Sequence, residues 1–297
     1  MLNKLIGDPD PIPAIIDYID VEYSPLIQLN DLNASYDRLE DQLSSLELWL
    51  HEAWGHDFYK TLITTPEKWA LTKAFEESKP QGSNILISDG FSLRELLVLK
   101  RAFGDRLSYK VGRSPVPTTT QSAAKQFFKV DNLTDAFNSE RLIMGERWRG
   151  KVITSILSPP QIGVSTSNML LTQFPDAPLT GAVAHRTTQV QDVATVMALL
   201  IDLIRGLATH SPLTITGDHG YIYLGPNPQS YMWKYIKAER TGGKYGDDGL
   251  QLDDCTVAVG RSHVNATIGG NTFITHGGVS LTESIVPVVT IKPGKLQ

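Results

Sequence analysis

The chain has 297 residues, of which 41% are apolar and 20% are charged, and its formal net charge is −5 at pH 7. These values suit one large globular domain or a domain with an appendage. They exclude a strongly basic protein whose main task is non-specific binding of duplex DNA, although a local basic groove stays open. The single cysteine, Cys255, excludes an internal disulfide and a zinc cluster of several thiolates. Residues 1–16 lack the apolar block of a signal peptide, and no run of about 18 apolar residues occurs. We therefore expect a cytoplasmic protein that does not span a membrane.

Residues 1–81 are predicted to be helical. In residues 29–55, apolar side chains recur at steps of three and four residues, which is typical of an amphipathic helix with one buried face. That face consists of Leu32, Tyr36, Leu39, Leu43, Leu46 and Leu50. A second helix is predicted for residues 66–80, because Pro66 suits a first helical turn and Pro80 suits the position after a helix end. We interpret residues 1–81 as a small helical N-terminal region.

From residue 82 onward, short apolar runs alternate with amphipathic segments. The predicted strands cover residues 84–88, 106–112, 151–157, 212–216, 255–260, 272–275 and 285–292. The predicted helices cover residues 91–104, 118–128, 187–210 and 229–240. Such alternation is typical of an α/β domain in which helices flank a mostly parallel central sheet, and we assign this fold to residues 82–297.

Residues that commonly bind metals stand at the ends of three predicted strands. Asp89 follows the first strand, Asp218 and His219 follow the strand at 212–216, and His276 follows the strand at 272–275. Each of these residues alone is more often part of a simple turn. At three strand ends of one sheet, however, they are expected to meet at the same edge, where ligands bind in α/β folds. Carboxylate oxygens together with imidazole nitrogens favour zinc, and also suit manganese.

Four motifs give the chain a resemblance to a known family. In chain order, "ISDG", "PTTTQ", "TGDHG" and "THGGVSLTESIVPVV" resemble the PglZ family of the alkaline phosphatase superfamily, and the last motif is the most specific. The resemblance covers residues 82–294 and leaves the helical N-terminus unexplained. It implies an alkaline-phosphatase-like fold and a metal-dependent phosphoesterase with two metal positions. Relatives of this kind occur in bacterial phage-defence systems, or cleave nucleotide phosphodiesters as response regulators.

The resemblance assigns the first metal position and the nucleophile. Asp89, Asp218 and His219 match the ligands of a tightly bound metal. Thr120 matches the nucleophile, which also contacts this metal, because it ends the family pattern Pro-x-x-Thr. The implied mechanism is attack by Thr120 on phosphorus, which gives a phosphothreonine that water then hydrolyses. The residues alone leave an alternative open, since a Thr in this segment also suits a plain helix cap.

The second metal position departs from the family pattern. His276 and His185 match two of its ligands, but the carboxylate expected four residues before His185 is replaced by Gly181. The second metal is therefore expected to bind weakly unless another carboxylate, such as that of Asp176, completes the site. A further departure follows Asp89, because the arginine and the acidic residue that the family has within about one turn are delayed to Arg94 and Glu95.

The expected substrate is a phosphodiester in a nucleotide or oligonucleotide, and the expected partners include proteins of a defence system. One alternative is a phosphomonoesterase or phosphomutase of the same superfamily. Another is a degenerate scaffold subunit of a phage-defence complex that catalyses nothing, which Gly181 favours. Arg240 and Lys244, near a glycine-rich loop, are candidates for contact with a substrate phosphate. Ser280 and Glu283 have the spacing of a capping box and are interpreted as structural.

Overall fold

The computed structural model describes residues 10–63, 69–78, 83–138, 140–143, 145–154, 167–180, 182–183, 186–187, 191–225, 228–264 and 273–294. Its helices are α2 (Ile12–Tyr23), α3 (Leu32–Trp54), α4 (His56–Leu62), α5 (Ala70–Glu77), α6 (Leu93–Phe103), α7 (Thr120–Ala123), α8 (Leu133–Ala136), α9 (Asp176–Thr180), α10 (Val193–Leu207) and α11 (Leu281–Ser284). Within the described ranges, no helix has the length and apolar character needed to cross a membrane.

The strands form one large sheet and several small ones. The large sheet contains β1 (Asn84–Ser88), β2 (Leu107–Arg113), β3 (Glu140–Ile143), β4 (Glu146–Val152), β5 (Asn168–Thr172), β8 (Leu213–Thr216) and β15 (Ile285–Ile291). The small sheets pair β6 (Ala182–Val183) with β7 (Arg186–Thr187), β9 (Ile222–Tyr223) with β14 (Ile274–Thr275), β10 (Lys234–Lys237) with β13 (Ser262–Val264), and β11 (Gly249–Gln251) with β12 (Thr256–Ala258).

The seven strands of the large sheet run in the order β2-β15-β8-β1-β5-β4-β3. The four consecutive strands β8, β1, β5 and β4 are parallel to one another, whereas β15 is antiparallel to both β8 and β2, and β3 is antiparallel to β4. This arrangement confirms the predicted α/β fold with a mostly parallel sheet. The carboxyl ends of β1 and β8 lie next to each other, which is where a parallel sheet positions residues for a site.

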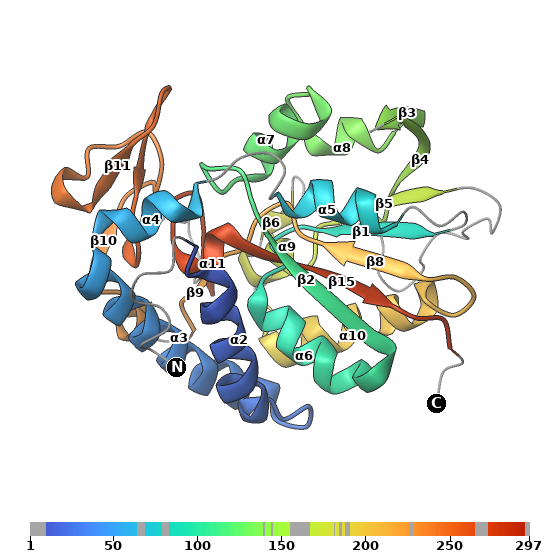
Figure 1. The fold of residues 1–297 in the computed structure, drawn as a ribbon, viewed down its shortest axis with the longest axis horizontal. Helices are drawn as coiled ribbons and strands as arrows, with labels where there is room; N and C mark the ends of the chain where they lie inside the picture. The colour runs from blue at the N-terminus through green and yellow to red at the C-terminus, as the bar shows by residue number, and fades with distance from the viewer. Residues whose placement is uncertain are drawn as a thin grey trace.

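Both faces of the central strands are covered, and every residue of β1, β5 and β8 is buried. Along β1, Leu86 packs in the core shared with α6 and α10, while its neighbours Ile85 and Ile87 face a second core that includes Phe75 of α5 and Trp148 of β4. Figure 1 shows α6 and α10 below the sheet and α5, α7 and α8 above it. This alternation follows from the two-residue period of a strand.

The helices before residue 81 pack against the α/β part of the chain. All six apolar positions predicted for the buried face of the first helix are buried in α3, which confirms the amphipathic helix. They belong to the same hydrophobic core as α6 and α10, and α3 packs against α10. The predicted boundary between residues 81 and 82 falls outside the described residues and stays a prediction.

One predicted helix is wrong. Residues 229–240 were expected to be helical, but they contain a short 3-10 turn at Pro228–Tyr231 and then the strand β10, which pairs with β13. Aromatic and β-branched residues such as Tyr235 and Ile236 favour extended backbone, and β13 supplies the hydrogen-bond partners.

Candidate metal centre

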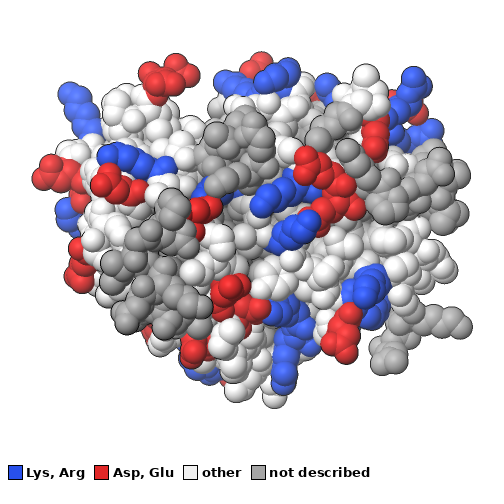
Figure 2. All heavy atoms as spheres, viewed as in Figure 1, with Lys and Arg blue, Asp and Glu red and all other residues white. Residues whose placement is uncertain are grey.

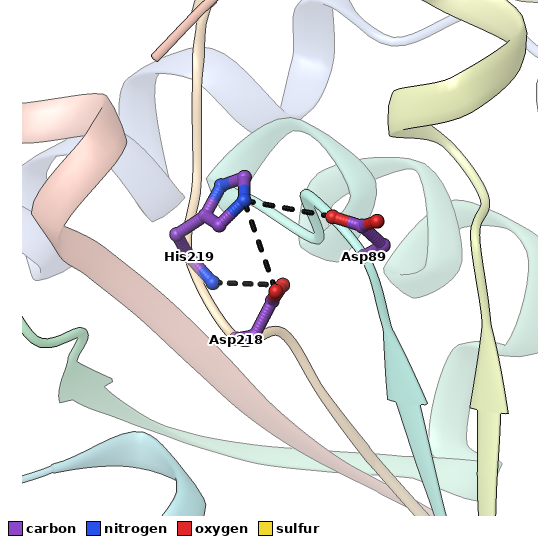
Figure 3. Close-up of side chains that lie close together, drawn as sticks. All are labelled: Asp89, Asp218 and His219. Atoms are coloured by element: carbon purple, nitrogen blue, oxygen red, sulfur yellow. Dashed lines mark hydrogen bonds and ion pairs between the residues drawn. The ribbon is translucent and has the colours of Figure 1, made fainter. Parts of the chain in front are cut away.

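Asp89 and Asp218 meet because β1 and β8 are adjacent parallel strands. Ile87 of β1 lies beside Thr216 of β8, so these two strands end at the same level of the sheet. The turns pack closely, since a side chain at Gly217 would come within 2.6 Å of the Phe91 carbonyl oxygen. Figure 3 shows the carboxylates of Asp89 and Asp218 and the ring of His219 converging from these two strand ends.

The three side chains place their ligand atoms in one small volume. The Nε2 atom of His219 lies 3.5 Å from Oδ1 of Asp89 and 3.8 Å from Oδ2 of Asp218. One carboxylate oxygen of Asp218 accepts hydrogen bonds from the backbone N–H groups of Gly90 (3.2 Å) and His219 (3.0 Å). The other, Oδ2, is buried and has no hydrogen-bond partner among the described residues. A buried unpaired carboxylate oxygen that faces an imidazole nitrogen is what a divalent cation would satisfy.

The orientation of His219 also fits a metal ligand. Its Nδ1 atom lies 2.9 Å from the carbonyl oxygen of Gly220, which accepts a hydrogen bond only if Nδ1 carries the hydrogen. The Nε2 atom then presents its lone pair to the two carboxylates. A backbone carbonyl that fixes the tautomer in this way is the usual support of a histidine that binds a metal.

Negative charge accumulates at this point of the structure. Burial raises the pKa of Asp89 well above its ordinary value, and the nearby carboxylates of Asp218 and Asp176 raise it further, while a hydrogen bond from Thr120 has the opposite effect. A cation held between these groups would remove the cause of the shift, because it balances the charge that burial and repulsion disfavour.

Of the three consecutive threonines, Thr120 faces the centre. Its Oγ1 atom lies 3.2 Å from Nε2 of His219 and 3.3 Å from Oδ1 of Asp89. The side chain of Thr119 caps α7 by accepting from the N–H of Ser122, so the cap that the sequence allowed belongs to Thr119. The hydroxyl of Thr118 is buried and donates to the Gly278 carbonyl oxygen (2.9 Å). The three hydroxyls therefore have three different surroundings, and among the described residues only that of Thr120 contacts predicted ligands.

His276 reaches the centre by a route that the sequence analysis did not predict. It was expected to follow a strand of the central sheet, but it follows β14, which pairs with β9 in a separate two-stranded sheet. The predicted position of this strand in the central sheet is wrong. Strand β9 follows the turn of His219, and β14 forms its backbone hydrogen bonds with β9. The rings of His219 and His276 nevertheless stack, with centroids 4.3 Å apart.

Asp176 lies within reach of His276. The Nε2 atom of His276 is 3.5 Å from Oδ1 of Asp176, and the Asp176 backbone N–H donates to the carbonyl oxygen of Asp89 (3.1 Å).

The ring of His276 is supported in the same manner as that of His219, because its Nδ1 atom lies 3.1 Å from the Thr118 carbonyl oxygen. Burial, and then the neighbouring His219, lower the pKa of His276, which favours the neutral form that binds metals. The other predicted ligand, His185, and Gly181 lie outside the described residues.

Arg240 is not placed to contact a substrate phosphate. Its guanidinium is fully buried and pairs with the carboxylate of Glu283, at 2.6 Å from Nη2 to Oε2. Glu283 also accepts from the backbone N–H of Gly278 (3.1 Å), two residues after His276. The predicted capping box is half formed: Ser280 accepts from the Glu283 N–H, while the Glu283 carboxylate is used by Arg240. Lys244, the other candidate, is exposed.

The comparisons with known proteins add no family. No protein-family model and no curated protein matches the chain. The resemblance to the PglZ family therefore stays a prediction from the motifs, and the geometry of the centre is the main support for a function.

Proposed function

We propose that the protein is a metal-dependent phosphoesterase that uses Thr120 as its nucleophile. The observation that carries the proposal is the position of the Thr120 hydroxyl, 3.2 Å from His219 Nε2 and 3.3 Å from Asp89 Oδ1, inside a group of residues whose chemistry suits zinc or manganese. A hydroxyl with no such neighbours is a weak nucleophile at neutral pH.

Asp89, Asp218 and His219 would hold the first cation, and Asp176 and His276 supply ligands for a second. When bound, a divalent cation lowers the pKa of a hydroxyl that coordinates it and balances charge on the phosphoryl oxygens. Asp89 Oδ1 accepts the hydrogen bond of the Thr120 hydroxyl and so orients its oxygen. In the first step, the Thr120 hydroxyl gives up its proton as Oγ1 bonds to phosphorus, the bond from phosphorus to the leaving oxygen breaks, and this oxygen departs as the protonated alcohol. In the second step, the oxygen of water bonds to phosphorus, the bond from phosphorus to Oγ1 breaks, and one proton of the water restores the Thr120 hydroxyl.

The preferred substrate is a phosphodiester in a nucleotide or a short oligonucleotide. On the face drawn in Figure 2, Lys and Arg side chains lie among Asp and Glu side chains, and the described residues of this face form no broad basic field. Together with the net charge of −5, this distribution supports a small substrate over a long duplex. Zinc is the preferred metal, and a role in phage defence is proposed from the motifs alone.

Asp176 bears on the alternative of a scaffold that catalyses nothing. That alternative depends on the carboxylate that Gly181 does not provide. The Asp176 carboxylate lies 3.5 Å from His276 and could take the place of the expected one, which supports the catalytic proposal over the scaffold.

The proposal is tested by hydrolysis of bis(4-nitrophenyl) phosphate and of 4-nitrophenyl phosphate, each with zinc, with manganese and with a chelator. We expect hydrolysis that depends on added metal and is faster for the diester. Faster hydrolysis of the monoester would favour the phosphomonoesterase alternative. If neither substrate is cleaved with either metal, the proposal of a phosphoesterase is wrong.

A further inference from the structure

Helix α3 carries two carboxylates that point into the protein interior. Glu40 and Glu47 are seven residues apart, which is about two helical turns, so they lie on the same face of α3. Both side chains are fully buried, on a helix whose other buried positions are mostly apolar. The helical N-terminus has no role in the resemblance to the PglZ family, and these two residues connect it to the metal centre.

Glu40 connects two of the loops that carry metal ligands. Its Oε2 atom accepts from Arg94 Nε at 2.8 Å and also from Nη2, and its Oε1 atom accepts from Arg261. Arg94 comes five residues after Asp89 in the chain. The same guanidinium donates through Nη1 to the carbonyl oxygen of Tyr221 at 3.0 Å, two residues after His219. Through one arginine, Glu40 thus fixes the turn after β1 relative to the turn after β8.

Glu47 connects the third loop. Its Oε2 atom accepts from Arg261 Nε at 3.0 Å, and its Oε1 atom accepts from the backbone N–H of Leu281 at 2.7 Å. Leu281 opens α11, five residues after His276. Since Arg261 bridges the two glutamates, carboxylates of one helix hold three of the four segments that carry described metal ligands, namely those of Asp89, His219 and His276. The fourth ligand, Asp176, begins α9 and is not part of this network.

Such a network is a costly way to stabilise a fold. Removing charged groups from water carries a large free-energy penalty, and well-packed apolar residues often stabilise an interior equally well or better. The side chains of Glu40, Glu47, Arg94 and Arg261 are all fully buried. Unlike apolar contacts, their hydrogen bonds are directional and fix particular backbone atoms near the ligands, such as the Tyr221 carbonyl oxygen and the Leu281 N–H.

We propose that Glu40 and Glu47 are positioning residues of the metal centre, and that α3 is part of the machinery that sets the metal affinity. This inference rests on the proposed metal site of the preceding subsection. The inference explains why Arg94 stands further from Asp89 than the arginine of the family pattern, since its partner, Glu40, is on α3. It also means that the helical N-terminus and the α/β part act as one unit.

The test compares zinc binding to the full chain and to three variants, with the dissociation constant measured by calorimetry and coordination followed by the visible spectrum of bound Co²⁺. Glu40→Gln keeps the shape but removes the charge between Arg94 and Arg261. Glu47→Asp keeps the charge, so it is expected to fold, but its shorter side chain cannot reach both Arg261 and Leu281. Leu43→Ala is the matched control, because it leaves a cavity on the same helix, between the two glutamates, without removing a hydrogen bond.

We expect the dissociation constant for zinc to rise about 10- to 100-fold in Glu40→Gln and about tenfold in Glu47→Asp, as for other supports of metal ligands, with altered Co²⁺ spectra. Leu43→Ala should lower the thermal midpoint but change the dissociation constant less than about twofold. The inference is overturned if Glu47→Asp binds zinc as tightly as the wild-type chain, or if Leu43→Ala weakens binding as much as the glutamate variants. A wild-type chain that binds no zinc would overturn the metal site itself, and with it this inference.

Discussion

The imidazole rings of His219 and His276 stack on each other, with centroids 4.3 Å apart and planes inclined by 25°. Each ring has its Nδ1 atom next to a backbone carbonyl oxygen and its Nε2 atom next to a carboxylate. The two predicted metal positions therefore adjoin and are built in the same way, but their described ligands differ in charge. Two carboxylates accompany His219, whereas Asp176 alone accompanies His276.

This difference predicts unequal affinities for two metals. The first position should hold zinc through purification, and the second should fill only when zinc is added, because it has fewer anionic ligands among the described residues. Asp176→Asn should then abolish binding of the second equivalent and leave the first in place. Asp202→Asn, a change to an exposed carboxylate on α10, is the control and should affect neither. Two full equivalents in unsupplemented wild-type protein would show that another residue completes the second position.

Removing the ligands after β8 should remove the tighter metal. Asp218→Asn keeps the shape of the side chain but not the charge, and His219→Ala in the same chain removes the nitrogen ligand. We expect less than about a tenth of the wild-type metal content by elemental analysis, given that loss of supporting groups alone costs 10- to 100-fold in affinity. The far-ultraviolet circular dichroism spectrum should be unchanged. Full metal occupancy in this double variant would show that Asp218 and His219 do not bind the metal and only form a turn.

Arg240 should matter for stability and not for substrate binding. Arg240→Met leaves the buried Glu283 carboxylate without its cation, which typically costs about 3–5 kcal/mol of unfolding free energy. Lys244→Met, a change at an exposed position, should alter the unfolding free energy by less than about 0.5 kcal/mol. Urea denaturation of both variants provides the measurement. If Arg240→Met is as stable as the wild-type chain, the ion pair is not structural, and a contact of Arg240 with substrate has to be reconsidered.

The raised pKa of Asp89 predicts how zinc binding depends on pH. The carboxyl group of Asp89 holds its proton more tightly in the folded chain than in the unfolded chain, where its pKa has the ordinary value of 3.8. In the absence of metal, its contribution to stability is therefore fully present below pH 3.8 and is lost as the pH rises through the folded pKa. Zinc needs the carboxylate, so the gain in thermal midpoint on adding zinc should be larger at about pH 7 than at about pH 5. Asp89→Asn should reduce this dependence. An equal gain at both pH values in the wild-type chain would contradict the assignment of Asp89 as a ligand.

The elements with strong periodic patterns could be predicted from the sequence. Helix α3 is predictable because it is buried on one face, which leaves apolar residues at helical spacing. Strand β1, which ends at Asp89, is predictable because it is buried on both faces, which leaves a short run of apolar residues. Strand β5 was missed. Its sequence, "NMLLT", has only three apolar residues between polar ones, and the burial of Asn168 is explained by its amide donating to Asn84 of β1 at 2.8 Å. A side-chain pair between two strands leaves no local signal in the sequence.

The site was predictable to the extent that it depends on strand ends. Asp89, Asp218 and His219 follow neighbouring strands of one sheet, so their convergence follows from the order of elements. The pairing of β9 with β14, which carries His276, depends on contacts between segments about fifty residues apart, and no local pattern specifies it. The buried partners of Arg94 and Arg261 on α3 could not be predicted for the same reason.

The rate of diester hydrolysis by Thr120→Ala tests the central claim most directly. We expect the rate with saturating zinc or manganese to fall by about 10³-fold or more, because the attacking oxygen is lost, while metal content and thermal stability stay near wild-type values. Thr119→Ser is the matched control: it changes the adjacent threonine but keeps the hydroxyl that caps α7, and it should retain nearly full activity. A Thr120→Ala variant that hydrolyses bis(4-nitrophenyl) phosphate at close to the wild-type rate would contradict the assignment of Thr120 as the nucleophile.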